Sequence, residues 1–239
     1  MNDLGALRAF LASDPALSAL LAEAKARDHG GDPAHDAAHA LRVALWTVRL
    51  GGAEVDPREA VAAALLHDAA NPPKNSPERA LASARSAALA EARLPALGFG
   101  ASSVARISAA IRDHSFSRGA APEDALGRAL QDADRLEALG AIGLLRCVST
   151  GVRLGGRGFD PEDPWAERRP LDDGTYAVDH FFTKLLSLPA TMRTAAGRAE
   201  AEKRAELLQE FLRALGTELG TGGPPEERRE GTGRKGGAK

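Results

Sequence analysis

The sequence predicts an all-α fold, and three features of the chain indicate it. Apolar positions recur at the three- and four-residue intervals of a helix, and His39, Val43, Trp46 and Leu50 share one such face. Segments rich in glycine, proline and aspartate, which start and stop helices, separate these runs. We find no internal repeat and no convincing run of alternating apolar and polar residues, which is the pattern of a half-buried strand.

The first half of the chain is expected to hold several short helices. Residues 4–27 form two of them, and a third runs over about residues 35–50 and is ended by a glycine pair. Asp56–Pro57–Arg58–Glu59 is a complete helix start, with an aspartate cap, proline at the first position and glutamate at the third. The helix that it opens contains the His67–Asp68 doublet and ends at Asn71–Pro72–Pro73.

The second half is expected to alternate further helices with loops. The predicted helices cover residues 76–94, 102–114, 123–147, 179–188 and 194–219. Gly140 and Gly143 fall inside the third of these, where glycine usually permits close helix packing at some cost in helix propensity. Residues 150–178 form one long loop, which in a compact domain is usually functional or mobile.

The composition suits one large globular domain. The chain has 239 residues, of which 44% are hydrophobic, so it can bury a sizeable core. We expect a single domain over residues 1–219. Residues 220–239 carry no apolar anchor and are expected to form a disordered tail.

The net charge and the cysteine content indicate which partners the protein binds and in which compartment it lies. The formal net charge of -2 gives no electrostatic case for binding nucleic acid or an anionic membrane. Cys147 is the only cysteine, which fits a reducing compartment. The start of the chain lacks the regions of a signal peptide, and no apolar run approaches the length of a membrane span. We therefore expect a soluble, cytoplasmic protein.

The chemistry is expected to centre on His67 and Asp68, which end an apolar helical run. Burying an imidazole and a carboxylate there is costly without a partner, and a divalent cation is a suitable one. His39 projects from the buried face of the preceding helix and can meet His67 if the two helices are antiparallel. Asp132 and Asp134 are both candidates for a fourth ligand. Two imidazoles and two carboxylates suit Mn, Fe, Co, Ni, Zn or Mg.

A zinc-protease site is a rival interpretation, because His35–Asp36–Ala37–Ala38–His39 mimics the H-E-x-x-H motif. That motif needs glutamate as the general base, and aspartate is one methylene shorter. The interpretation also leaves the His67–Asp68 doublet without a role. We therefore reject it.

The ordered set of a helical histidine, a His-Asp doublet and a distant aspartate resembles the HD superfamily of metal-dependent phosphohydrolases. The matching stretches are His39–Ala40–Leu41–Arg42–Val43, Leu65–Leu66–His67–Asp68 and Asp132–Ala133–Asp134–Arg135–Leu136. The resemblance implies an HD-domain helical bundle, with an HD core at about residues 30–150 and C-terminal helices at 179–219, around a mononuclear metal site. In that pattern the last metal ligand precedes a basic residue, which selects Asp134. Asp132 then becomes a neighbour of the site, and Arg135 a phosphate contact.

Within the superfamily, the chain is similar to the bacterial branch associated with nucleoside triphosphate hydrolysis. The similarity spans about residues 30–215, and the stretches that carry it are residues 35–39, 71–75, 131–143 and 179–186. It implies hydrolysis of a (deoxy)nucleoside triphosphate to monophosphate and pyrophosphate, by attack of metal-bound hydroxide. The same metal site would also suit three alternatives: a nucleoside 5′-monophosphatase, a cyclic-nucleotide phosphodiesterase or a non-catalytic nucleotide sensor. The expected partner in every case is a small-molecule nucleotide.

Further side chains are candidate substrate contacts, each with a plain structural alternative. Lys74 and Asn75 follow the doublet closely enough to bind phosphate, and they equally suit an ordinary loop. His114 is either a substrate contact or a favourable helix-end residue. His180 and Lys184 share a helix face at i, i+4 and either close over a substrate or form a surface pair.

The number of metal ions and the surroundings of the ligands can also be anticipated. His35 and Asp36 are expected beside the site, with His35 as a cap or as a contact to a ligand. A di-iron oxygenase site is a rival, because some HD proteins bind two metals. Such proteins need additional histidines before the final aspartate, and here only His114 lies between Asp68 and Asp134. One divalent metal ion, Mn²⁺ first, is therefore expected.

Overall fold

The protein is helical, and the prediction of an all-α fold is confirmed. The computed structural model describes residues 1–27, 36–70, 77–115, 119 and 121–229. Within these ranges it contains eleven α-helices and no β-strand, with one isolated bridge between Arg157 and Tyr176. The expected tail is described as far as residue 229, and residues 230–239 lie outside the described ranges.

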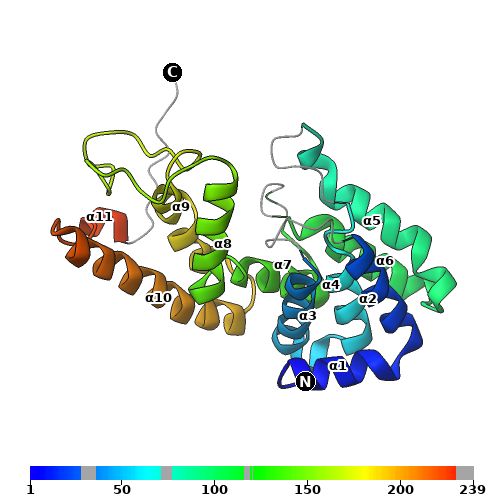
Figure 1. Cartoon of the computed structure of the whole chain (residues 1–239). Coiled ribbons are helices and arrows are strands. Elements are labelled where there is room, and N and C mark those ends of the chain that lie inside the picture. Colours follow the sequence, from blue (N-terminus) through cyan, green and yellow to red (C-terminus); the bar gives the residue numbers. More distant parts are fainter. Residues whose placement is uncertain (28–35, 71–76, 116–118, 120, 230–239) are drawn as a thin grey trace. The chain divides into compact units, whose positions relative to one another are not determined.

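The chain forms two compact units, Met1–Arg135 and Leu136–Lys239 (Figure 1). The helices of the first unit are α1 (Leu4–Ser13), α2 (Pro15–Arg27), α3 (Ala37–Gly51), α4 (Pro57–Leu66), α5 (Ala82–Arg93), α6 (Ala101–Asp113) and α7 (Ala125–Leu136). The helices of the second unit are α8 (Gly140–Arg153), α9 (Ala177–Thr183), α10 (Ala195–Leu219) and α11 (Glu226–Arg229). The single domain expected over residues 1–219 stays a prediction.

Helix α4 is the centre of the first unit. All of its residues from Glu59 to Leu66 are buried, and half of them are alanine, so other helices can approach its axis closely. Helices α2, α3 and α6 pack against it. Asp56 caps its N-terminus by accepting the backbone N–H of Arg58 at 2.7 Å, as the sequence predicts. The His67–Asp68 doublet therefore emerges from the most buried helix of the unit.

An ion pair between a buried carboxylate and a partly exposed guanidinium joins α4 to α6. Glu59 is 7% exposed, and one of its carboxylate oxygens accepts the Nε–H of Arg106 at 3.0 Å. A second guanidinium N–H of Arg106 contacts the other oxygen. The pair fixes the position of α6 along α4, and His114 follows the last residue of α6.

The first two helices are short and meet at a sharp bend. Among the described residues no single helix is long and apolar enough to cross a membrane; α1 and α2 satisfy the length and composition criteria only as a pair, and they are bent by 115° at their junction. Asp14 occupies that junction and accepts the backbone N–H of Ala16 at 2.8 Å. Its other carboxylate oxygen accepts the Nε–H of Arg58 at 2.7 Å, which ties the bend to α4.

The long helix predicted over residues 123–147 is wrong, because the chain breaks between α7 and α8. Gly140 adopts a left-handed φ of 67°, which glycine accommodates without strain. A Cβ atom on Gly143 would lie 2.2 Å from the carbonyl carbon of Ala138, so only glycine fits at that position. The two glycines therefore build a turn instead of a close packing of helices, and α8 continues to Arg153.

The long loop of the second unit is confirmed, shortened to residues 154–176, and it is held by buried charges. Arg169 pairs with Asp179 through two hydrogen bonds of 2.5 and 2.9 Å, and the side chain of Asp179 is 0% exposed. Asp179 also accepts the backbone N–H of Asp172 at 2.7 Å. The loop is thereby fastened to the first turn of α9.

Candidate metal centre

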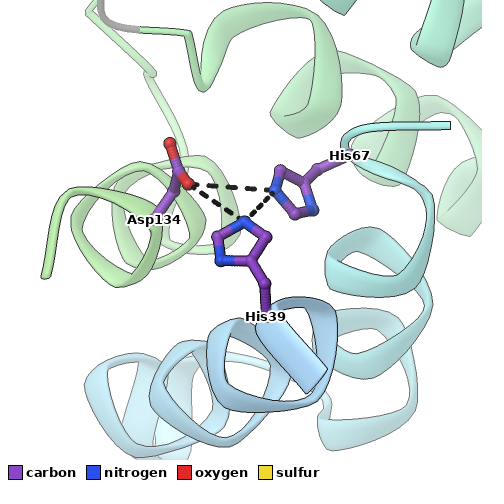
Figure 2. Close-up of side chains that lie close together, drawn as sticks. All are labelled: His39, His67 and Asp134. Carbon is purple, nitrogen blue, oxygen red and sulfur yellow. Dashed lines mark hydrogen bonds and ion pairs between the residues drawn. The ribbon is translucent and has the colours of Figure 1, made fainter. Parts of the chain in front are cut away.

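His39, His67 and Asp134 converge in the first unit from three different helices (Figure 2). The Nε2 atoms of His39 and His67 are 3.3 Å apart. Oδ1 of Asp134 lies 3.5 Å from Nε2 of His39 and 3.8 Å from Nε2 of His67. Residues far apart in the chain thus direct three ligand-type atoms at one point.

Asp68 brings a second carboxylate to the same cluster. Its Oδ2 lies 3.4 Å from Nε2 of His67 and 4.0 Å from Nε2 of His39. The side chains of Asp68 and Asp134 are 25% and 29% exposed, whereas those of both histidines are 1% exposed. The two imidazoles are therefore buried, and the two carboxylates lie on the side of the cluster that solvent reaches.

His67 is locked in one orientation by its own helix. It is the C-cap residue of α4, and its Nδ1 lies 2.7 Å from the carbonyl oxygen of Ala64. A carbonyl oxygen only accepts hydrogen bonds, so Nδ1 must carry a proton. In the neutral ring the lone pair then lies on Nε2, which faces the cluster and suits a cation.

His39 is fixed through its backbone. Asp36 is the N-cap of α3, and its Oδ1 accepts the backbone N–H of His39 at 2.6 Å. The capping interaction holds the first turn of α3, from which the imidazole projects towards the cluster. Asp36 therefore acts on the backbone of His39, and its predicted role beside a metal ligand stays a prediction.

The charges of the cluster fit a divalent cation. Burial by itself would raise the pKa of Asp134, but the neighbouring imidazoles, led by His67 and His39, outweigh it and lower that pKa. Two carboxylates, the Nε2 lone pair of His67 and a second imidazole nitrogen only 3.3 Å away face one another. These atoms repel one another unless a proton or a metal ion lies between them.

The spacing of the cluster also fits a metal. Ligand atoms about 2.0–2.2 Å from a tetrahedral ion are about 3.3–3.6 Å apart. Three contacts among the four side chains, of 3.3, 3.4 and 3.5 Å, lie within this range or at its edge, whereas two others, of 3.8 and 4.0 Å, are longer. Two nitrogen and two oxygen donors suit the divalent first-row metals and Mg²⁺, and the geometry does not select one of them.

Asp134, and not Asp132, belongs to the group of converging ligand atoms among the described residues. Asp132 is fully buried two positions earlier on α7. Arg135 follows directly and is 6% exposed. The resemblance chose Asp134 as the metal ligand; that choice and the roles of Asp132 and Arg135 stay predictions.

The remaining predicted site residues fall outside this cluster or outside the described ranges. His35, Lys74 and Asn75 lie outside the described residues. His180 and Lys184 belong to the second unit. Lys184 follows the end of α9 and has a φ of -144°, so the pair does not keep the i, i+4 spacing of a continuous helix.

His180 has neighbours that the sequence did not suggest. Its Nδ1 lies 3.0 Å from Oδ2 of Asp173, and the hydroxyl of Thr183 donates to the same oxygen at 2.7 Å. Burial alone would raise the pKa of Asp173, but the contacts with His180 and Thr183 outweigh it and lower that pKa. Asp173 is in the long loop, where no periodicity links it to α9.

His114 is the histidine whose place the sequence left most open, and the structure brings it to the cluster. Its Nε2 lies 3.9 Å from Oδ1 of Asp68, and its ring meets that of His67 edge to face at 5.0 Å. His67, Asp68 and His114 form a second group of three converging ligand atoms. Both histidines directly follow the last residue of a helix, which is the one feature that they share in the sequence.

Comparison with known proteins agrees with this geometry. Residues 36–139 match the HD domain family, a stretch that contains all five side chains of the cluster and is somewhat under half of the chain. YpgQ of Bacillus subtilis (strain 168), an uncharacterized protein, is 37% identical over 90 residues, which are 37% of this chain and 38% of that protein. The chain thus aligns with little more than a third of that relative's length.

Similar solved structures extend the likeness over most of the chain. The crystal structure of Bacillus subtilis YpgQ in complex with ADP has a TM-score of 0.65 and 26% identity, covering 84% of this chain and 96% of that one. A structure described as a predicted HD superfamily hydrolase, from an uncultured Thermotogales bacterium, has a TM-score of 0.60 and 29% identity over 89% and 98% of the two chains. An HD-superfamily hydrolase from Bacillus thuringiensis has a TM-score of 0.63 and 27% identity, with 85% and 96% covered.

Proposed function

We propose that this protein is a metal-dependent phosphohydrolase that acts on nucleotides. The observation that carries the proposal is the convergence of His39, His67 and Asp134, with Asp68 beside them, from separate helices onto one point. The similar HD-superfamily hydrolases support a hydrolytic use of such a site. The ADP complex of YpgQ supports a nucleotide as the ligand.

In this proposal His39, His67, Asp68 and Asp134 hold one divalent cation, with Mn²⁺ as the first candidate. When bound, such a cation polarises a phosphoryl oxygen and lowers the pKa of coordinated water. The two carboxylates balance the two charges of the ion, so the loaded site is close to neutral. A polyanionic phosphate chain therefore needs further positive charge from the protein.

Cationic side chains near the ligands are the proposed source of that charge. Arg135 adjoins Asp134 on α7 and, as a planar guanidinium, can bind two phosphate oxygens together. Lys74 and Asn75 follow the doublet in the sequence and are proposed as further phosphate contacts. His180 and Lys184 are retained as proposed substrate contacts, which single substitutions test.

The partly exposed carboxylates suggest how reactants reach the proposed cation. Asp68 and Asp134 are partly exposed, whereas the imidazoles behind them are not. Water and phosphate oxygens can therefore approach from the carboxylate side only. That arrangement excludes bulk water from the imidazole face and holds the ligands in one geometry, as electrostatic preorganisation requires.

The proposed reaction is hydrolysis of a (deoxy)nucleoside triphosphate to monophosphate and pyrophosphate. The test is a nucleotide panel incubated with Mn²⁺, Mg²⁺, Co²⁺ or Ni²⁺, with products separated by chromatography. Equal amounts of monophosphate and pyrophosphate are expected. Release of orthophosphate from monophosphates, or opening of cyclic nucleotides, would replace the proposed reaction by a phosphatase or a phosphodiesterase. Tight nucleotide binding without any product would identify a sensor and overturn the enzymatic proposal.

A further inference from the structure

His114 is held by the same local device as His67. It is the C-cap residue of α6, and its Nδ1 lies 2.6 Å from the carbonyl oxygen of Ile111, three residues earlier. His67 is the C-cap of α4, with Nδ1 at 2.7 Å from the carbonyl oxygen of Ala64, also three residues earlier. Two helices thus end in the same way, each with an imidazole locked by its own last turn.

The lock decides what His114 can bind. Since a carbonyl oxygen only accepts, Nδ1 carries the proton, and the lone pair of the neutral ring lies on Nε2. A neutral imidazole in this tautomer cannot donate a hydrogen bond to a phosphate oxygen through Nε2. It is in the form that binds a cation.

Nε2 of His114 also points at the cluster without a hydrogen bond there. The side chain is 6% exposed, and the nearest carboxylate oxygen, Oδ1 of Asp68, is 3.9 Å away, beyond hydrogen-bond distance. The nitrogen therefore lies within reach of an ion that His67 and Asp68 would also bind.

Asp68 links the two histidine pairs. Its Oδ2 faces Nε2 of His67 and Nε2 of His39, while its Oδ1 faces Nε2 of His114. The ligand atoms of His67, Asp68 and His114 all lie within 4.8 Å of one another, as do those of His39, His67 and Asp134. Because the single lone pair of His67 Nε2 is common to both groups, the two groups describe the surroundings of one ion.

We propose that His114 binds the same cation as a third imidazole ligand in the substrate-free protein. This deepens the proposed function and rests on its metal site, and it replaces the role of His114 as a phosphate contact. The ligand set of the substrate-free protein becomes three imidazole nitrogens and two carboxylates. Three imidazoles favour Mn²⁺, Fe²⁺, Co²⁺ or Ni²⁺ over Mg²⁺, which prefers oxygen ligands.

The test counts imidazoles on Co²⁺ bound to the full-length protein without nucleotide. X-ray absorption spectroscopy is expected to show three imidazoles in the wild type and two in His114→Ala, with Co²⁺ affinity, measured against a competing chelator, reduced about 10-fold or more. Arg112→Ala changes an exposed side chain at the same end of α6 and is expected to match the wild type. His114→Gln, which keeps a side chain of similar reach, is expected to lose one imidazole as well, and circular dichroism confirms that each variant is folded.

Several results would overturn the inference. They are two imidazoles in the wild type, an affinity within twofold of wild type in both His114 variants, or two Co²⁺ ions per chain. The nucleotide panel separates this inference from the proposed function. Three imidazoles without any nucleotide hydrolysis would support the ligand and refute the enzyme, whereas hydrolysis with two imidazoles would do the reverse.

Discussion

The buried pair between Arg169 and Asp179 is predicted to be the main fastening of the long loop in the second unit. Asp179 is 0% exposed and makes two hydrogen bonds to the guanidinium, so removing Arg169 leaves a buried carboxylate with one backbone partner, the N–H of Asp172. Breaking a buried pair by deleting one member costs about 3–5 kcal/mol. Since Arg169 itself is 19% exposed, we expect the lower end, about 3 kcal/mol, for Arg169→Met.

Unfolding of the second unit can be measured separately, because the chain has two tryptophans and they lie in different units. In a Trp46→Phe background, fluorescence of the buried Trp165 follows unfolding of the second unit in urea, and linear extrapolation gives the free energy of unfolding. Arg168→Met is the matched control, because that side chain is exposed next to the pair. A loss below about 1 kcal/mol in Arg169→Met, or an equal loss in the control, would refute the reasoning.

Three further predictions concern the first unit. Asp134→Asn is expected to abolish tight Mn²⁺ binding while Asp132→Asn retains it, as titration calorimetry would show; the opposite ranking would exchange their roles. Asp36→Ala is expected to cost about 1 kcal/mol of stability in thermal unfolding, because α3 loses its N-cap, and an unchanged midpoint would contradict this. Burial raises the pKa of Glu59, but Arg106 outweighs it and lowers that pKa, so the pair stabilises the protein above the unfolded pKa near 4.5 and the stabilisation is lost as pH falls through the folded value. The difference in unfolding free energy between wild type and Glu59→Gln should therefore be larger at pH 7 than at pH 3.5, and a difference that does not depend on pH would be inconsistent with the ion pair.

The sequence predicted the features that depend on local pattern. The helix that opens at Asp56 follows from its cap and its proline, and the buried face of α3 places His39 on the inside. The meeting of His39 with His67 follows because consecutive helices joined by a short connection usually pack together. The choice of Asp134 over Asp132 required the resemblance to a family, since both lie on one amphipathic helix.

The features that the sequence missed depend on contacts between distant segments. His114 was predicted only as a candidate substrate contact; it reaches His67 and Asp68 because α6 packs against α4, and no spacing in the chain encodes that approach. The break at Gly140 depends on a left-handed φ of 67°, and glycine inside an apolar run permits that conformation without requiring it. Arg169 and Asp173 lie in a loop without periodicity, so their partners on α9 were beyond pattern analysis.

The central claim is that His67 and Asp68 hold one catalytic divalent cation. The most direct measurement is titration of chelator-stripped protein with Mn²⁺, for the wild type, His67→Ala and Asp68→Ala, with helicity followed by circular dichroism. We predict one ion per chain in the wild type, none detectable in either variant, and helicity largely retained in all three. Stoichiometric Mn²⁺ in either variant would contradict the account.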